Sequence, residues 1–162
     1  MSRTAVTMRE AHLGDTRFLQ GLWQDSLRRA DAADQVIDLE LIVKTAAGSP
    51  EQRLLIAEYD GVPAGAVFLR ATTFGPLNLE PALQIIAPHV VPPMRRHGVG
   101  RALMDAAVAF AEELGIPTVS SAALAGSRDG NRFLARLGFG PQATLRQAPT
   151  ATVRGRLTAS RP

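Results

Sequence analysis

Apolar residues recur at two spacings along the chain, and each spacing predicts one kind of secondary structure. The clearest helical period has steps of four, three, four and four residues and ends before Gly115; its members are Val99, Leu103, Ala106, Phe110 and Leu114. Further helices are predicted over residues 16–27, with Thr16 as N-cap, and over 39–47 and 127–137. Apolar runs between turn residues predict strands at residues 4–8, 52–59, 64–71, 82–91 and 118–123, and two weaker strands at 144–147 and 150–157.

The order of these elements predicts a mixed α/β (α+β) fold. Asp60-Gly61 lies between two predicted strands and is a typical hairpin signal, so those strands are expected to pair antiparallel. The later alternation of strands and helices predicts that the same sheet also contains other pairings. A length of 162 residues suits one domain, residues 1–162.

Composition narrows the class of function. The chain has no cysteine, which excludes a disulfide scaffold, a thiolate metal site and a cysteine nucleophile. Three dispersed histidines give no reason to expect a metal. Aromatic residues make up only 5%, which argues against a stacking platform for single-stranded nucleic acid. No basic segment followed by an apolar run opens the chain, and no 18-residue apolar stretch occurs, so we expect a cytoplasmic protein without a membrane partner.

The net charge of +3 is too small to indicate a nucleic-acid partner. Its distribution is more informative. Residues 1–93 carry eight basic and eleven acidic side chains, whereas residues 127–162 carry seven basic and one acidic. The basic excess therefore belongs to the second half of the chain, and three arginines between these two regions, Arg95, Arg96 and Arg101, form a local cluster.

The predicted strand at residues 82–91 runs into a glycine-containing turn and then into the helix that begins near Val99. Free backbone N–H groups and the positive end of the helix dipole coincide at such a helix start. Gly98 and Gly100 have no side chains that would keep a ligand away from the backbone. No acidic residue follows the arginine cluster until Asp105. The segment therefore predicts an anion site for a phosphate or pyrophosphate, the alternative being a plain helix-start turn.

Three phosphate-binding motifs compete for this turn. A P-loop needs Gly-x4-Gly-Lys-Ser/Thr, and no lysine follows either glycine. A dinucleotide fingerprint needs a small third residue where Leu103 stands, and it belongs to the first strand–helix unit of a chain. The residues present instead resemble the acetyl-CoA signature of the GNAT N-acetyltransferase superfamily; they are Val90-x-Pro92-x-x-Arg95-x-x-Gly98-x-Gly100.

A second stretch extends the resemblance. It is similar to the GNAT motif in which an Asn opens a helix that ends in Gly-Phe, and its residues are Asn131, Phe133, Leu134, Leu137, Gly138 and Phe139. The segment Met8-Arg9-Glu10-Ala11 resembles the family's first strand and the start of its first helix, so the resemblance covers roughly residues 4–157. It implies a mostly antiparallel central sheet that splays apart after the fourth strand and is flanked by about four helices.

The resemblance also implies acetyl-CoA as the acetyl donor, without a metal. Val90 and Val91 would offer backbone groups to the pantetheine and the thioester carbonyl, and the side chains of Arg95 and Arg101 would add charge-assisted contacts. Asn131 would meet the pantetheine arm, unless it only caps its helix. Phe133 or Arg136 would lie near the adenine or the 3′-phosphate. The backbone amides that would hold the pyrophosphate are those of Arg96, His97, Gly98, Val99, Gly100 and Arg101.

The implied reaction is direct attack of an amine on the thioester, but two groups frequent in the family are missing. Leu134 occupies the place of a tyrosine acid, and Gln84 stands six residues before Val90, where many members carry a base. Glutamine cannot serve as a base, so water, the substrate itself or another carboxylate must do so. Glu80 and Gln84 are the residues assigned to the reacting centre, with Glu58 as a further candidate carboxylate.

The expected acceptor is a primary amine in a small molecule or a peptide, and a homodimer is one possible assembly. Residues 28–38, the loop at 72–80 and a hairpin formed by the two weak C-terminal strands are expected to line the acceptor pocket. The missing catalytic groups favour one alternative, namely a non-catalytic acyl-CoA-binding regulatory module on the same fold.

Overall fold

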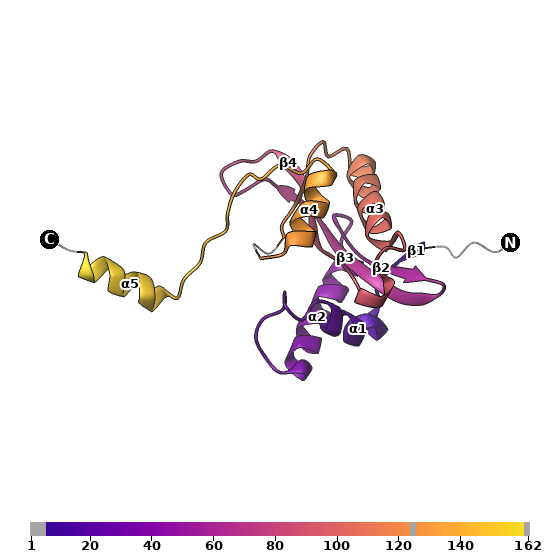
Figure 1. The fold of residues 1–162 in the computed structure, drawn as a ribbon, viewed down its shortest axis with the longest axis horizontal. Coiled ribbons are helices and arrows are strands. Elements are labelled where there is room, and N and C mark those ends of the chain that lie inside the picture. The colour runs from indigo at the N-terminus through magenta and orange to yellow at the C-terminus, as the bar shows by residue number, and fades with distance from the viewer. Residues whose placement is uncertain (1–5, 124–125, 161–162) are drawn as a thin grey trace.

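The computed structural model describes residues 6–123 and 126–160. A twisted five-stranded sheet carries helices on both faces, and one C-terminal helix stands apart from this body (Figure 1). The strands are β1 (Val6–Glu10), β2 (Gln52–Tyr59), β3 (Val62–Thr73), β4 (Pro81–Val90) and β5 (Val119–Ser121). The helices are α1 (Thr16–Leu22), α2 (Ala32–Ala47), α3 (Val99–Leu114), α4 (Arg128–Arg136) and α5 (Thr150–Ala159), with 3₁₀ turns η1 (Leu13–Asp15) and η2 (Pro92–Met94).

The strands lie side by side in chain order, β1-β2-β3-β4-β5. The first three pairings are antiparallel and the last, between β4 and β5, is parallel, which confirms the predicted mixed sheet. The β2–β3 turn is the predicted one, with Asp60 at φ +55° and Gly61 at φ +79°. A parallel pair needs a crossover, and α3 supplies it between β4 and β5.

Each face of the sheet has its own apolar core. Alternate residues of a strand point to opposite faces, so Leu55 and Ala57 pack under α3 while Leu54 and Ile56 pack against α1 and α2. The α3 core is centred on the fully buried Phe110. Figure 1 shows α1 and α2 on one side of the sheet and α3 and α4 on the other.

Several predicted boundaries of helices and strands agree with the structure, and others differ from it. The strand at Gln52–Tyr59 and the helix at Val99–Leu114 are confirmed. The helix predicted at residues 39–47 begins earlier, because the Asp31 side chain accepts a hydrogen bond from Asp34 N (2.8 Å) and caps the first turn of α2. Asp15, rather than Thr16, is the N-cap of α1. Of the predicted strand 4–8, residues 4 and 5 lie outside the described residues.

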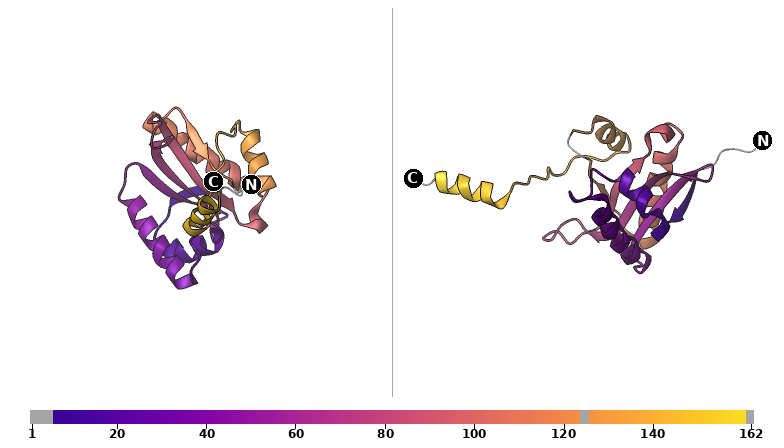
Figure 2. Two further views of the ribbon diagram at one scale, coloured as in Figure 1. Left: turned by 90° about the vertical axis from the view of Figure 1, so that its left-hand side faces the viewer. Right: turned by 90° about the horizontal axis from the view of Figure 1, so that it is seen from below.

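The two predicted C-terminal strands are wrong. Residues 139–149 form no described strand or helix, and the segment after them is the helix α5. Val153 and Leu157 are four residues apart, which is a helical spacing, and Pro149 precedes the first turn with φ −58°. The expected C-terminal hairpin over the acceptor pocket therefore does not exist, and Figure 2 shows α5 projecting away from the sheet.

One ion pair between the half-buried Arg9 and the buried Asp15 ties β1 to the start of α1. The two terminal nitrogens of Arg9 donate to the carboxylate oxygens of Asp15 at 2.8 Å, and Arg9 also contacts Glu58 at 3.2 Å. Burial raises the pKa of Asp15, but the bonds from Arg9 and from His12 N more than offset this and hold the pKa below its ordinary value of 3.8. The ionised carboxylate is therefore the form that stabilises the fold.

We expect Asp15→Asn to lower the free energy of unfolding at pH 7 by about 2 kcal/mol, because charged hydrogen bonds to a buried group are lost. The wild type keeps this stabilisation above pH 3.8 and loses it as the pH falls through the lowered pKa, so the two proteins should converge in acid. Urea unfolding of wild type and variant at pH 7 and at pH 3 measures the difference in the free energy of unfolding at each pH. The exposed Asp105→Asn should change neither value by more than about 0.5 kcal/mol. A difference as large at pH 3 as at pH 7 would contradict the account.

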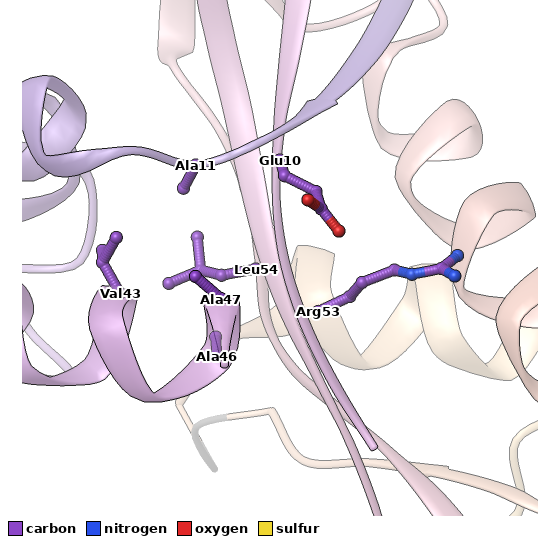
Figure 3. A pocket seen from close by; sticks show the side chains of 7 residues that line it. All are labelled: Glu10, Ala11, Val43, Ala46, Ala47, Arg53 and Leu54. Atoms are coloured by element: carbon purple, nitrogen blue, oxygen red, sulfur yellow. The ribbon is translucent and has the colours of Figure 1, made fainter. Parts of the chain in front are cut away.

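No helix within residues 6–123 and 126–160 is long and apolar enough to cross a membrane. Figure 3 shows a pocket where the end of α2 meets β1 and β2. Its walls are largely small aliphatic side chains, and the guanidinium of Arg53 points toward α3, where it binds Glu113 at 2.8 Å. Its one carboxylate is the exposed Glu10, and none of the residues assigned to the donor or to the reacting centre lines it, so the candidate chemistry lies elsewhere.

Candidate active site

The segment between β4 and α3 has the conformation of an anion-binding turn. Arg96 and Gly98 both have left-handed backbones, at φ +68° and +83°, and Gly98 is the N-cap of α3. The first intrahelical bond runs from Ala102 N to Gly98 O at 3.0 Å. The N–H groups of the helix start have no intrahelical acceptor, and no side chain caps them. A ligand that accepts hydrogen bonds is suited to this position.

The charge of the turn matches its backbone. Arg95, Arg96 and Arg101 are exposed, and none of them forms an ion pair with any acidic side chain that the structure describes. The positive end of the α3 dipole adds to this charge. The residues that the sequence assigned to the pyrophosphate thus lie on one turn and one helix start.

Gly65 of β3 lets the end of β4 come unusually close to its neighbour. A Cβ on Gly65 would lie 2.7 Å from the backbone oxygen of His89 and 3.1 Å from Cγ1 of Val99. Gly65 and Val90 are register partners, and Val91 N donates to Ala64 O at 2.8 Å. A residue without a side chain on β3 therefore sets the position of both β4 and the first turn of α3.

The sheet opens where β4 passes this point. Only Leu83, Gln84 and Ile85 of β4 pair with β5, and the hydroxyl of Ser121 donates to Ile85 O at 2.8 Å. Residues 86–90 have no strand partner on that edge within the described part of the chain. This is the splay predicted after the fourth strand, and it leaves the backbone at Val90 and Val91 beside the uncapped helix.

A bulge in β4 lies at the start of the open stretch. Ala66 pairs with His89 and Phe68 with Ile86, so the register shifts between them. Ala87 has φ +50°, a conformation that a residue with a Cβ adopts only when its surroundings hold it. The indole Nε1 of Trp23 donates to Ala87 O at 3.0 Å.

Helix α4 packs against the start of α3. Cζ of Phe133 lies 3.8 Å from the position of a Cβ on Gly100, and Cγ2 of Val90 lies at the same distance, so three predicted site residues are neighbours. The Asn131 amide donates to Ser127 O at 2.7 Å, and Ser127 is the N-cap of α4. Phe133 therefore supports the turn by packing, and Asn131 is held by its own helix.

The residues assigned to the reacting centre lie near the β3–β4 hairpin. Glu80 is exposed, and its backbone N–H donates to the side chain of Asn78 at 3.1 Å. Oε1 of Gln84 accepts two bonds from Arg70, at 2.9 and 3.2 Å. Glu58, the further candidate, is engaged by Arg9. Neither Glu80 nor Gln84 is hydrogen-bonded to the other in the described structure.

Two contacts at the site have no signal in the sequence. The rings of Tyr59 and His97 lie 5.0 Å apart, which joins the end of β2 to the anion-binding turn. Trp23 and Ala87 are 64 residues apart in the chain. Both contacts join segments that only the tertiary fold brings together, so the local apolar spacing does not predict them.

Comparison with models of protein families shows to which family the chain belongs. The model of the Acetyltransferase (GNAT) family matches residues 15–139, which is most of the chain. The chain belongs to the GNAT acetyltransferase family. This confirms the resemblance and the enzyme class predicted from the two motifs, and both motifs fall within the matched residues.

Solved structures show the same GNAT fold over nearly the whole chain. Aminoglycoside N-acetyltransferase AAC(6')-Iy in complex with CoA is 15% identical with a TM-score of 0.74, covering 92% of this chain and 97% of its own. A transcriptional regulator from Bacillus halodurans C-125 is 22% identical with a TM-score of 0.72, covering 89% and 99%. A predicted acetyltransferase with acetyl-CoA from Clostridium acetobutylicum is 15% identical with a TM-score of 0.68, covering 91% and 98%.

At these identities the likeness shows the fold of the GNAT chain and not its substrate. No curated protein sequence matches it significantly. The residues of its site therefore have to be assigned from its own geometry.

Proposed function

We propose that the protein is an acetyl-CoA-dependent N-acetyltransferase that moves an acetyl group to a primary amine. The observation that carries the proposal is the uncapped, arginine-rich start of α3 beside the open edge of β4. Family membership supplies the reaction class. Two of the similar structures contain CoA or acetyl-CoA, which supports the choice of donor.

The residues present fit the chemistry of acyl-CoA. Its pyrophosphate needs several hydrogen-bond donors and positive charge, which the amides of residues 96–101 and the side chains of Arg95 and Arg101 would supply. The pantetheine arm contains amides, which the backbone of Val90 on the open edge of β4 would bind like a further strand. The N–H of Val91 already donates to Ala64 O, so Val91 would contribute its remaining backbone group. The 3′-phosphate and adenine would lie toward Phe133 and Arg136 on α4.

When bound, acyl-CoA supplies the thioester: the amine nitrogen bonds to its carbonyl carbon, the carbon–sulfur bond breaks, and the proton lost by the amine compensates the thiolate. The chain contributes mainly position. Holding two reactants in line removes much of the entropic cost of a bimolecular reaction. Backbone N–H groups near the bulge and at Val90 would stabilise charge on the carbonyl oxygen.

Few of the candidate side chains could accept the proton that the amine loses. Gln84 carries no titratable group, and its oxygen is occupied by Arg70, so its role would be to orient Arg70 at the reacting centre. Glu58 is occupied by Arg9, which leaves the exposed Glu80 or solvent as the acceptor of the amine proton.

The acceptor would enter from the face that carries α1 and α2. Residues 28–38 carry three aspartates and two arginines, so their charge excess is a single negative charge. Asp38 is paired with Arg28 and Asp31 caps α2, which leaves the exposed Asp34 as the carboxylate that faces solvent there. This carboxylate would attract a cationic amine, in a small molecule or a peptide. The proposal includes neither nucleic acid nor a membrane partner. A single domain, a cytoplasmic location and a homodimer remain predictions.

A thiol-release assay tests the function directly. Because the chain has no cysteine, a thiol reagent reports only the CoA that is released. We expect release from acetyl-CoA that depends on an added primary amine, across a panel of polyamines, amino sugars, amino acids and peptides. Tight binding of CoA without turnover of any amine would instead favour the regulatory module that Gln84 and Leu134 suggest, and release that does not depend on an amine would mean hydrolysis and contradict an amine acceptor.

A further inference from the structure

The β4 bulge leaves polar backbone groups that the sheet does not use. Ala87 and Pro88 have no register partner on β3, since Ala66 pairs with His89 and Phe68 with Ile86. Pro88 has no N–H to satisfy. The carbonyl of Ala87 does need a donor, and the indole N–H of Trp23 reaches it at 3.0 Å.

Trp23 is itself held firmly. The residue is 5% exposed and packs in the core between α1, α2 and the sheet. Its backbone N–H donates to Leu19 O at 2.8 Å, at the C-cap of α1. A rigid indole of this kind can impose its geometry on the strand, because it binds the carbonyl of the left-handed Ala87, a residue without a register partner on β3.

The main chain of Trp23 holds the opposite side of the site. Its carbonyl accepts from Ser26 N at 2.8 Å and from Leu27 N at 3.1 Å, and so closes the turn that leads into residues 28–38. That segment is fixed further by Gln35, which donates to Arg28 O at 3.0 Å and accepts from Gln20 at 2.8 Å. Trp23 therefore contacts both the strand proposed for the acyl donor and the turn that leads into the segment proposed for the acceptor.

We infer that Trp23 is a positioning residue for acyl transfer: its indole N–H holds the β4 bulge in the orientation that aligns the thioester with the incoming amine. The inference rests on the proposed function, since it assigns the open stretch of β4 to the acyl donor. Trp23 acts through the backbone of Ala87 and touches no reacting atom.

The chain has a single tryptophan, so replacing all tryptophan during expression changes this site alone. The analogue β-(3-benzothienyl)alanine keeps the shape of the side chain and replaces the N–H with sulfur. We expect kcat to fall about tenfold while the KM for acetyl-CoA stays within about twofold, because the phosphate turn is unchanged and only alignment is lost.

Two genetic variants complete the test. Trp23→Phe removes the N–H together with part of the ring and should show the same split between kcat and KM. Phe18→Leu is the matched control, since Phe18 packs against the same core and makes no side-chain hydrogen bond; it should lower Tm and leave kcat unchanged. An unchanged kcat in both Trp23 variants, or a kcat loss as large in Phe18→Leu, would overturn the positioning role.

Hydrogen exchange without substrate separates this inference from the proposed function. In the Trp23 variants the amides of residues 86–91 should exchange at least tenfold faster, and those of β2 should not change. If the wild type acetylates no amine, the proposed function fails, and exchange still decides whether Trp23 holds the bulge. If the amides of residues 86–91 exchange at the same rate in the wild type and in the Trp23 variants, that result alone would overturn the inference.

Discussion

Replacing Gly98 with glutamate is expected to lower the affinity for CoA by about 100-fold. The new carboxylate would stand at the positive start of α3, where the structure leaves backbone donors for an anion. Losing two hydrogen bonds to a charged group costs about 3 kcal/mol, which corresponds to about two orders of magnitude in Kd. Isothermal titration with CoA and with acetyl-CoA measures the change.

The chain contains a matched control at the other end of the same helix. Gly115 is also left-handed, at φ +69°, and a Cβ at either glycine meets nothing within 4 Å. Gly115→Glu therefore carries the same backbone strain and the same charge, and it should lower Tm at least as much as Gly98→Glu. Its affinity for CoA should equal that of the wild type. Equal affinities in the two variants would remove α3 from the donor site.

Adding one methyl group at Gly65 is expected to damage both the fold and the site. The Cβ of Gly65→Ala would meet the backbone oxygen of His89 at 2.7 Å, so β3 and β4 must separate. Overpacking of this kind costs about 1–3 kcal/mol, which for a chain of this length lowers Tm by roughly 3–10 °C. Since His89 and Val90 move with β4, the KM for acetyl-CoA should rise as well.

Gly21→Ala is the control, because it makes the same glycine-to-alanine change where no steric clash occurs. Gly21 lies in α1, and a Cβ added there would meet nothing within 4 Å, so Gly21→Ala should stabilise the protein by about 0.5–1 kcal/mol. Differential scanning calorimetry and acetyl-CoA kinetics follow both variants. A Gly65→Ala protein with wild-type Tm and KM would show that the close approach of β3 to β4 is not required.

The sequence is sufficient where local pattern and backbone geometry agree. The helix Val99–Leu114 has an uninterrupted apolar period and a glycine at each end, and both boundaries are confirmed. The turn before it is also predictable, because a helix start with glycines and arginines carries its chemistry in consecutive residues. The family match covers the same motifs.

Other features have a weak or misleading local signal, and one depends on the tertiary fold. The N-terminal half of α2 escapes prediction although Asp31 is a good N-cap, because the apolar spacing is clear only from Leu39 onward. The sequence of helix α5 predicts a strand because its threonines and Val153 favour extended structure, and only the four-residue spacing to Leu157 indicates a helix. The contact of Trp23 with Ala87 requires the tertiary fold itself.

The pairing of β4 with β5 also bears on how the chain reaches its folded form. Strands β2, β3 and β4 follow one another through hairpins, so their contacts are close in sequence and can form early. Strand β5 joins by only three residue pairs, and only after α3 has crossed the sheet. The edge proposed to receive the acyl donor is thus completed by the contact that is most distant in sequence, and a bound donor that spans the gap would strengthen the least cooperative part of the sheet.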